Sequence, residues 1–76
     1  MNEKELEKCL ETFRLRLYQL MNNHNMNQTD LAMAIDISQA AMNKTCKGDT
    51  MPRIYTLIAI AKYFNVSADW LLGLDK

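Results

Sequence analysis

The sequence predicts an all-α fold, a compact domain of five helices whose first helix is extended at its N-terminus. Apolar residues recur every three or four positions along most of the 76-residue chain, which is the period of an α-helix and not of a strand. Asparagine, serine and glycine, which favour helix ends, separate these apolar runs. A chain of this length forms one small domain, so we expect the helices to share one core.

The first helix is predicted from about Asn2 to Asn23. Its apolar stripe, with spacings of four and three residues, consists of Leu6, Leu10, Phe13, Leu17 and Leu20. The run Asn22-Asn23-His24-Asn25 ends this helix, because asparagine favours turns and left-handed backbone. We divide the chain into an N-terminal helical extension, residues 1–12, and a main domain, residues 13–76.

A second helix begins after Asn27, which is a good N-cap, and Asp30 occupies its third position near the positive end of the helix dipole. The expected inward face comprises Leu31, Ala34 and Ile35.

The chain then turns within residues 36–38, and Ser38 caps a short third helix that buries Met42 and ends near Gly48. Because only three residues connect the second and third helices, these helices are expected to cross steeply, so that the third projects as a ridge of the width of a DNA major groove. The small side chain of Ala32 allows the close approach. A generic helical hairpin is the alternative at this point.

Pro52 stands at the predicted start of a fourth helix, where the missing N–H costs nothing. Its expected inward face comprises Ile54, Leu57, Ile60, Ala61 and Phe64. Asn65 ends this helix, Ser67 caps a fifth helical segment over residues 68–72, and Gly73 closes it. No segment alternates with period two over more than a few residues, so no sheet is predicted.

The nine basic and nine acidic residues cancel, which argues mildly against a nucleic-acid partner. Their distribution is uneven. Residues 1–12 carry two basic and four acidic residues, net −2, whereas residues 13–62 carry six basic and three acidic residues, net +3. On charge alone, an ordinary solvated surface is the favoured interpretation.

Several function classes are disfavoured. Cys9 and Cys46 have no CxxC spacing and His24 has no second ligand nearby, so we expect no metal and no cofactor. His24 also lacks a nucleophile or carboxylate arranged around it, and there is no glycine-rich phosphate loop, so an enzyme is not expected. Isolated cysteines without a secretory signal fit a cytoplasmic protein, and no stretch is long enough to span a membrane.

The run NQTDLAMAIDISQAAMNKTCKG, residues 27–48, resembles the helix-turn-helix of phage-repressor-like (Cro/cI-type, XRE family) transcriptional regulators. The family's glutamine, small residue, turn residue and apolar anchor fall on Gln28, Ala32, Asp36 and Met42. The resemblance continues through Pro52, Leu57 and Ile60-Ala61 to the closing run of residues 66–73, and it covers about residues 16–73. It implies a transcriptional regulator whose partner is double-stranded DNA.

Within this resemblance, Gln39 projects from the N-terminal end of the recognition helix, where an amide can bond an adenine bidentately. In several repressors of this type the glutamine eleven residues earlier, here Gln28, braces it and contacts a phosphate. Either glutamine alone would usually be a solvated polar residue. The predicted DNA-binding set is Gln28, Thr29, Ser38, Gln39, Ala40, Asn43, Lys44, Lys47 and Arg53.

The recognition helix offers three further base contacts by its spacing: Ala40 to a thymine methyl, Asn43 to adenine, and Lys44 to guanine or phosphate. Lys47 and Arg53 are better interpreted as phosphate contacts. Arg16 matches an arginine common on the first helix of the family, with a solvated charge or a helix-surface ion pair as the alternative.

The motif departs from the family pattern at two places. Asp36 replaces the turn glycine, and aspartate is among the more tolerant residues in left-handed backbone. Met21 and Cys46 stand where many members have a buried arginine–glutamate pair. Because replacing both members of such a pair by apolar groups is often neutral, we predict that the two side chains touch.

Apolar residues near both ends predict a dimer contact made of Leu6, Leu10, Trp70, Leu71 and Leu74. A two-fold homodimer would place two recognition helices about 34 Å apart, one turn of DNA. The sequence thus favours a repressor that acts as a dimer on a palindromic operator, without a small-molecule ligand. The alternative is an antitoxin-like or anti-regulator protein-interaction module with the same fold.

Overall fold

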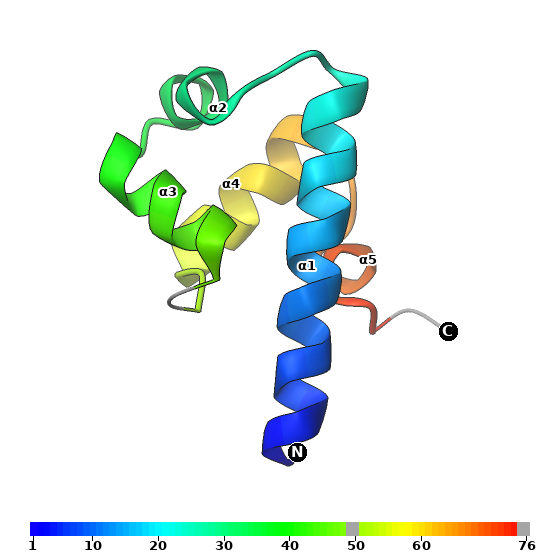
Figure 1. Ribbon diagram of the computed structural model, residues 1–76. Helices are drawn as coiled ribbons and strands as arrows, with labels where there is room; N and C mark the ends of the chain where they lie inside the picture. The colour runs from blue at the N-terminus through cyan, green and yellow to red at the C-terminus, as the bar shows by residue number, and fades with distance from the viewer. Residues whose placement is uncertain (49–50, 75–76) are drawn as a thin grey trace.

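The computed structural model describes residues 1–48 and 51–74, and in these residues the chain forms five α-helices and no strand. The helices are α1 (Glu3–Asn23), α2 (Gln28–Ala34), α3 (Gln39–Lys47), α4 (Ile54–Phe64) and α5 (Ala68–Leu72) (Figure 1). The predicted all-α fold of five helices is confirmed, including the extended first helix.

Side chains that precede the helices satisfy the first backbone N–H groups, as the sequence predicts. Asn27 and Asp30 form a reciprocal capping box at α2, with N···O distances of 2.8 and 3.1 Å. Ser38 Oγ accepts from the backbone of Ala41 at α3, and Ser67 Oγ accepts from α5. Each such cap contributes about 1 kcal/mol to helix stability.

The start of α4 differs from the prediction. Pro52 lies before the N-cap and not in the first turn, because the backbone of Arg53 is still extended, with φ −72° and ψ 155°. Arg53 is the N-cap, and its side chain makes no capping hydrogen bond. The helix therefore begins at Ile54.

Three helices end at residues with left-handed backbone: Gly48 after α3, Asn65 after α4 and Gly73 after α5. Glycine adopts this conformation without a Cβ clash, and asparagine tolerates it. All three positions were predicted as helix ends from residue type alone. The path of the chain out of these helices is therefore a local property of the sequence.

Every helix contributes a side chain to one core. The largest fully buried side chains are Phe13, Leu17, Leu31, Met42, Ile60 and Leu71. α5 packs alongside α1 and against α4, and α2 packs on α3 (Figure 1).

The buried faces of α2 and α4 differ from the predicted ones, because each helix is rotated about its axis. On α2, Ala34 is exposed and Ala32 is buried at 3% exposure, because the helix turns residues 31, 32 and 35 inward. On α4, Thr56, Ile60 and Phe64 are buried, whereas Ile54 is 70% exposed. Ile54 lies two residues before Thr56, about 200° around the helix, and so faces outward.

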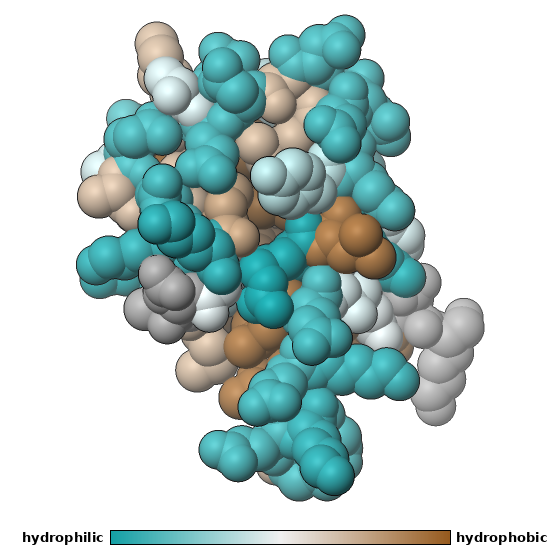
Figure 2. Space-filling model, viewed as in Figure 1, coloured by the Kyte–Doolittle hydropathy of each residue, from teal (hydrophilic) through white to brown (hydrophobic). Residues whose placement is uncertain are grey.

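The N-terminal half of α1 extends beyond the body of the molecule (Figure 1). Its first buried residue is Phe13, and Leu6, Cys9 and Leu10 are half-buried. Figure 2 shows that mainly hydrophilic residues cover this projecting part. The helix is continuous across residue 12, and our division into an extension and a main domain stays a prediction. The last two residues of that predicted domain lie outside the described residues.

We predict that Ala32→Leu destabilises the protein by about 1–3 kcal/mol, because a buried position between α2 and α3 has no room for the added methyl groups. Ala34→Leu is the matched control, since the same change on the exposed face of α2 should stay within about 0.5 kcal/mol. Urea unfolding followed by circular dichroism measures both. Equal effects of the two variants would contradict the assigned rotation of α2.

Candidate nucleic-acid interface

The connection between α2 and α3 is a tight turn centred on Asp36, whose φ is +58°. Ile37 donates its backbone N–H to the carbonyl of Ala32 at 3.0 Å, and Ser38 then begins the next helix as its N-cap. Asp36 thus adopts the left-handed backbone expected of the turn residue. Aspartate accepts this conformation at a modest cost.

Met42 is completely buried and sets the rotation of α3. The opposite side of this helix is open: Gln39, Ala40, Lys44 and Lys47 are exposed, and Asn43 is half-buried. α3 lies at the opposite edge of the molecule from α5 (Figure 1). It therefore presents a polar and cationic face, with an amide at its first position.

The predicted residues of α2 lie at its N-terminal end. Gln28 is the first residue of the helix and is half-buried, and Thr29 is exposed. Gln28 and Gln39 thus each open one helix of the pair. The bracing of Gln39 by Gln28 stays a prediction.

A groove of about 620 Å³ separates α3 from the start of α4. Four predicted DNA-binding residues line it: Ser38, Ala40, Lys44 and Arg53. The other lining residues are Asp36, Ile37, Ala41, Thr45, Met51, Tyr55 and Thr56. Gln28, Thr29, Gln39, Asn43 and Lys47 are not among them. The structure thus brings part of the predicted set together around one hollow.

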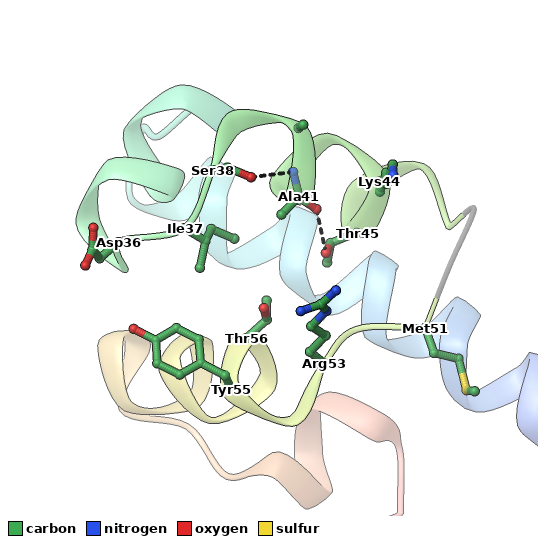
Figure 3. Close-up of a pocket in the computed structure, with 11 residues that line it drawn as sticks. Asp36, Ile37, Ser38, Ala41, Lys44, Thr45, Met51, Arg53, Tyr55 and Thr56 are labelled. Atoms are coloured by element: carbon green, nitrogen blue, oxygen red, sulfur yellow. Dashed lines mark hydrogen bonds between the residues drawn. The ribbon is translucent and has the colours of Figure 1, made fainter.

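Two cations and one carboxylate border this groove. The side chain of Arg53 points from the start of α4 toward α3, and Lys44 extends from α3 itself (Figure 3). Asp36 lies at the far end, beside Ile37. The lining carries two positive charges against one negative charge, which favours an anionic ligand such as a phosphate.

Two hydroxyl groups that line the groove already form hydrogen bonds within α3. Thr45 donates its hydroxyl to the carbonyl of Ala41 at 2.9 Å, so it supports its own helix. Ser38 Oγ accepts the N-cap hydrogen bond at 3.1 Å and keeps its own proton for donation. Both bonds are drawn in Figure 3. Ser38 is therefore the better candidate for a phosphate contact.

Sequence reasoning missed the contribution of α4 to this groove. Tyr55 reaches the end of α2, where its hydroxyl lies 3.5 Å from the carbonyl of Ile35. Thr56 is buried at the same place. A polar threonine between tyrosine and leucine in an apolar helix was an available signal, but the direction in which its side chain points depends on how α4 is rotated.

Arg14 is a second missed residue, and it lies at the other end of α3. Its guanidinium covers Gly48, where an added Cβ would come within 2.5 Å of Nη1. A cation at a helix C-terminus interacts favourably with the helix dipole. Arg14 thus supports the end of the recognition helix from α1.

Arg16 connects α1 to α5. Its Nη1 donates a hydrogen bond to the backbone carbonyl of Trp70, and the guanidinium lies 4.9 Å from the centroid of the Trp70 ring. Cation–π contacts of this kind contribute about 0.5–1 kcal/mol at partly exposed sites. The arginine that matches the family position thus has an internal, structural partner.

The predicted dimer contact is wrong at one residue. Leu71 has 0% exposure, because α5 turns it into the core, so it cannot contact a second copy. Trp70, Leu6 and Leu10 are half-buried, and Leu74 is 56% exposed. The remaining four residues stay a prediction.

Met21 is buried, and Cys46 packs against the core cluster to which Met21 belongs. The Sγ atom of Cys46 lies 3.8 Å from Sδ of Met42. Burial raises the pKa of the Cys46 thiol, so it stays protonated near neutral pH and behaves as an apolar group. The direct contact between Met21 and Cys46 stays a prediction.

Within residues 1–48 and 51–74, no three histidine, cysteine or acidic side chains gather where they could hold a metal ion. None of the helices in that part of the chain combines the length and the apolar character that crossing a membrane requires.

Comparison with known proteins supports the resemblance found in the sequence. A family model described as helix-turn-helix matches residues 17–71. The HTH-type transcriptional activator BcrR of Enterococcus faecalis is 35% identical over 61 residues. The alignment covers 80% of this chain and 30% of the activator, so the chain spans less than a third of that relative's length. No solved structure matches the chain.

We predict that Asp36→Gly raises the free energy of unfolding by about 0.5–1 kcal/mol, because glycine adopts the left-handed turn without a Cβ penalty. Asp36→Asn should stay within about 0.5 kcal/mol, since asparagine tolerates the same backbone. Asp36→Ala should lower the free energy by about 1 kcal/mol. Denaturant unfolding ranks the three variants. An alanine variant as stable as the glycine variant would contradict the strained turn.

Proposed function

The chain belongs to the helix-turn-helix family of DNA-binding transcriptional regulators, of the phage-repressor-like (XRE) type, and we propose that it reads a palindromic operator as a dimer. This membership indicates a DNA-binding regulator and not an enzyme. The observation that carries the proposal is the orientation of α3, which buries Met42 and exposes Gln39 at its first position. A helix held in this way can lie in a major groove with its N-terminal end toward the bases.

Base recognition is assigned to the exposed side of α3. Gln39 can bond the N6 and N7 atoms of an adenine, and the adjacent methyl group of Ala40 can contact a thymine methyl. Asn43 follows Gln39 by four residues, which puts it on the same side of α3, and its amide can bond a second adenine in the major groove. The expected half-site is therefore rich in adenine and thymine at the positions that face the start of α3.

Phosphate contacts are assigned to the residues around the groove between α3 and α4. Lys44 and Arg53 supply charge from its two sides, and the Ser38 hydroxyl supplies a donor. Lys47 and Thr29 are exposed and can reach the backbone on either side. These contacts position the protein, while the bases provide specificity. Local clustering of cations lets a protein of zero net charge bind an anionic polymer.

We propose that regulation is repression by occupation of the operator. Occupation needs only the DNA-binding surface described above. BcrR is named as an activator, but that name describes a protein of which this chain matches less than a third. In vitro transcription from a promoter that overlaps the selected operator distinguishes repression from activation. Increased transcript would contradict repression without affecting the assignment of DNA binding.

A protein-interaction module, antitoxin-like or anti-regulator, is the second candidate. The zero net charge and the exposed apolar residues Leu15 and Tyr18 on α1 favour it. A DNA-binding protein loses affinity steeply as salt rises, because phosphate contacts release counterions. A module that binds only protein shows no salt-dependent binding to any duplex. Selection of bound sequences from a random DNA pool therefore separates the two.

We predict that Gln39→Ala removes the preference for one base pair in each half-site, a loss of about 1–3 kcal/mol in discrimination. Lys47→Ala is the control from the same helix. It should weaken binding to all sequences alike and reduce the slope of log K against log salt by about one. Fluorescence anisotropy with the selected operator and single-base variants measures both effects. Unchanged base preference in the Gln39 variant would contradict its role in reading the operator.

A further inference from the structure

The two glycines of the chain share one feature, because a side chain of α1 lies directly over each of them. A Cβ added at Gly73 would come within 2.9 Å of Cγ2 of Thr12. A Cβ added at Gly48 would come within 2.5 Å of Nη1, 2.7 Å of Cζ and 3.0 Å of Cδ of Arg14. Three atoms of one arginine thus occupy the space that a side chain at position 48 would need.

Left-handed backbone is not by itself a reason for glycine in this chain. Asn25, Asp36 and Asn65 have φ angles of 54°, 58° and 56°, and they keep their side chains. Asn65 adopts this backbone as the C-cap of α4, the same position that Gly48 occupies after α3. The missing side chain at position 48 therefore serves the contact with Arg14 as well as the φ of +79°.

This contact joins two parts of the molecule. Helix α3 has its most extensive packing with α2, whereas α1 has its most extensive packing with α5. In Figure 1 the C-terminal end of α3 approaches the middle of α1, where Arg14 lies half-buried. Arg14 thus connects the end of the recognition helix to the longest helix of the fold.

Both residue types suit the contact. The last carbonyl groups of a helix carry a partial negative charge, which attracts a guanidinium group. A guanidinium group is planar and can lie on a backbone that has no Cβ, whereas the ammonium group of lysine is a compact point charge. The contact therefore depends on arginine at position 14 and on glycine at position 48.

We propose that Arg14 is a positioning residue for base recognition, because it holds the end of α3 against α1 and so fixes the direction in which this helix enters the major groove. The inference rests on the proposed function, in which Gln39 and Asn43 read bases from α3. The turn at Asp36 and the buried Met42 hold the first half of α3, and Arg14 adds a contact beyond its last residue. A recognition site has to be held within about 0.5 Å and 10–20°. Arg14 acts through α3 and does not itself contact DNA.

Binding of the full chain to the selected operator, to its single-base variants and to a random duplex tests this proposal, with fluorescence anisotropy over a salt series. Arg14→Ala and Arg14→Lys should each reduce discrimination at the base pair read by Gln39 by at least about fivefold, with unchanged salt dependence. Lys8→Ala removes the same charge from an exposed position on α1 and should discriminate like the wild type. Circular dichroism checks folding, and Arg14→Lys decides the matter if the alanine variant is unfolded.

A double-mutant cycle tests the contact between Arg14 and Gly48. Gly48→Ala should weaken discrimination in the wild type, because the added methyl group displaces the guanidinium group. In the Arg14→Ala background the same substitution should have little further effect. The strain of alanine at a φ of +79° is present in both backgrounds, so it cancels in the comparison.

Three outcomes would overturn the proposal. Arg14 variants that lose stability but discriminate like the wild type would leave Arg14 with structural support alone. Equal weakening on every duplex, with the salt slope reduced by about one, would make Arg14 a phosphate contact instead. An equal effect of Gly48→Ala in both backgrounds would exclude the contact. A wild type without salt-dependent binding to any duplex would instead contradict the proposed function, and the cycle measured by urea unfolding would still test the contact.

Discussion

The candidate nucleic-acid interface depends on one contact, the packing of α3 against the core through Met42. This side chain is completely buried, and it lies four residues after the Ser38 cap, so the start, the direction and the rotation of the helix are set together. The short turn at Asp36 allows the close packing because the neighbouring Ala32 has almost no side chain. A larger residue at position 32 would separate the two helices and change the angle at which α3 leaves the surface.

For the attraction of DNA to this surface, the location of the charged residues matters more than the net charge of the chain. The chain is neutral, yet Lys44 and Arg53 face each other across the groove beside α3, while four of the nine acidic residues lie within residues 1–12. An electrostatic field at a surface depends on such local groupings, and screening at physiological salt limits the influence of distant charges to about 8 Å. The acidic end of α1 therefore weakens the attraction of DNA to the groove very little.

The inner face of α4 completes the core through Thr56, Ile60 and Phe64. A domain of this length buries only a modest core, and small domains often gain stability from oligomerisation when they lack disulfides or metals. Cys46 is a free, half-buried thiol whose raised pKa keeps it apolar, so the described cysteines add packing and not a covalent link.

The sequence by itself determined the helices and their ends. Asn27, Ser38, Ser67, Gly48 and Gly73 act within a few residues of their own position, so their type predicts where the backbone starts and stops. Met42 and Asp36 could be assigned for the same reason. The tertiary structure alone decided the rotation of α2 and α4. Ala32 and Thr56 are buried while Ala34 and Ile54 are exposed, because the rotation of a short helix depends on packing against distant segments. The groove beside α3 and the Arg16–Trp70 contact follow from those rotations.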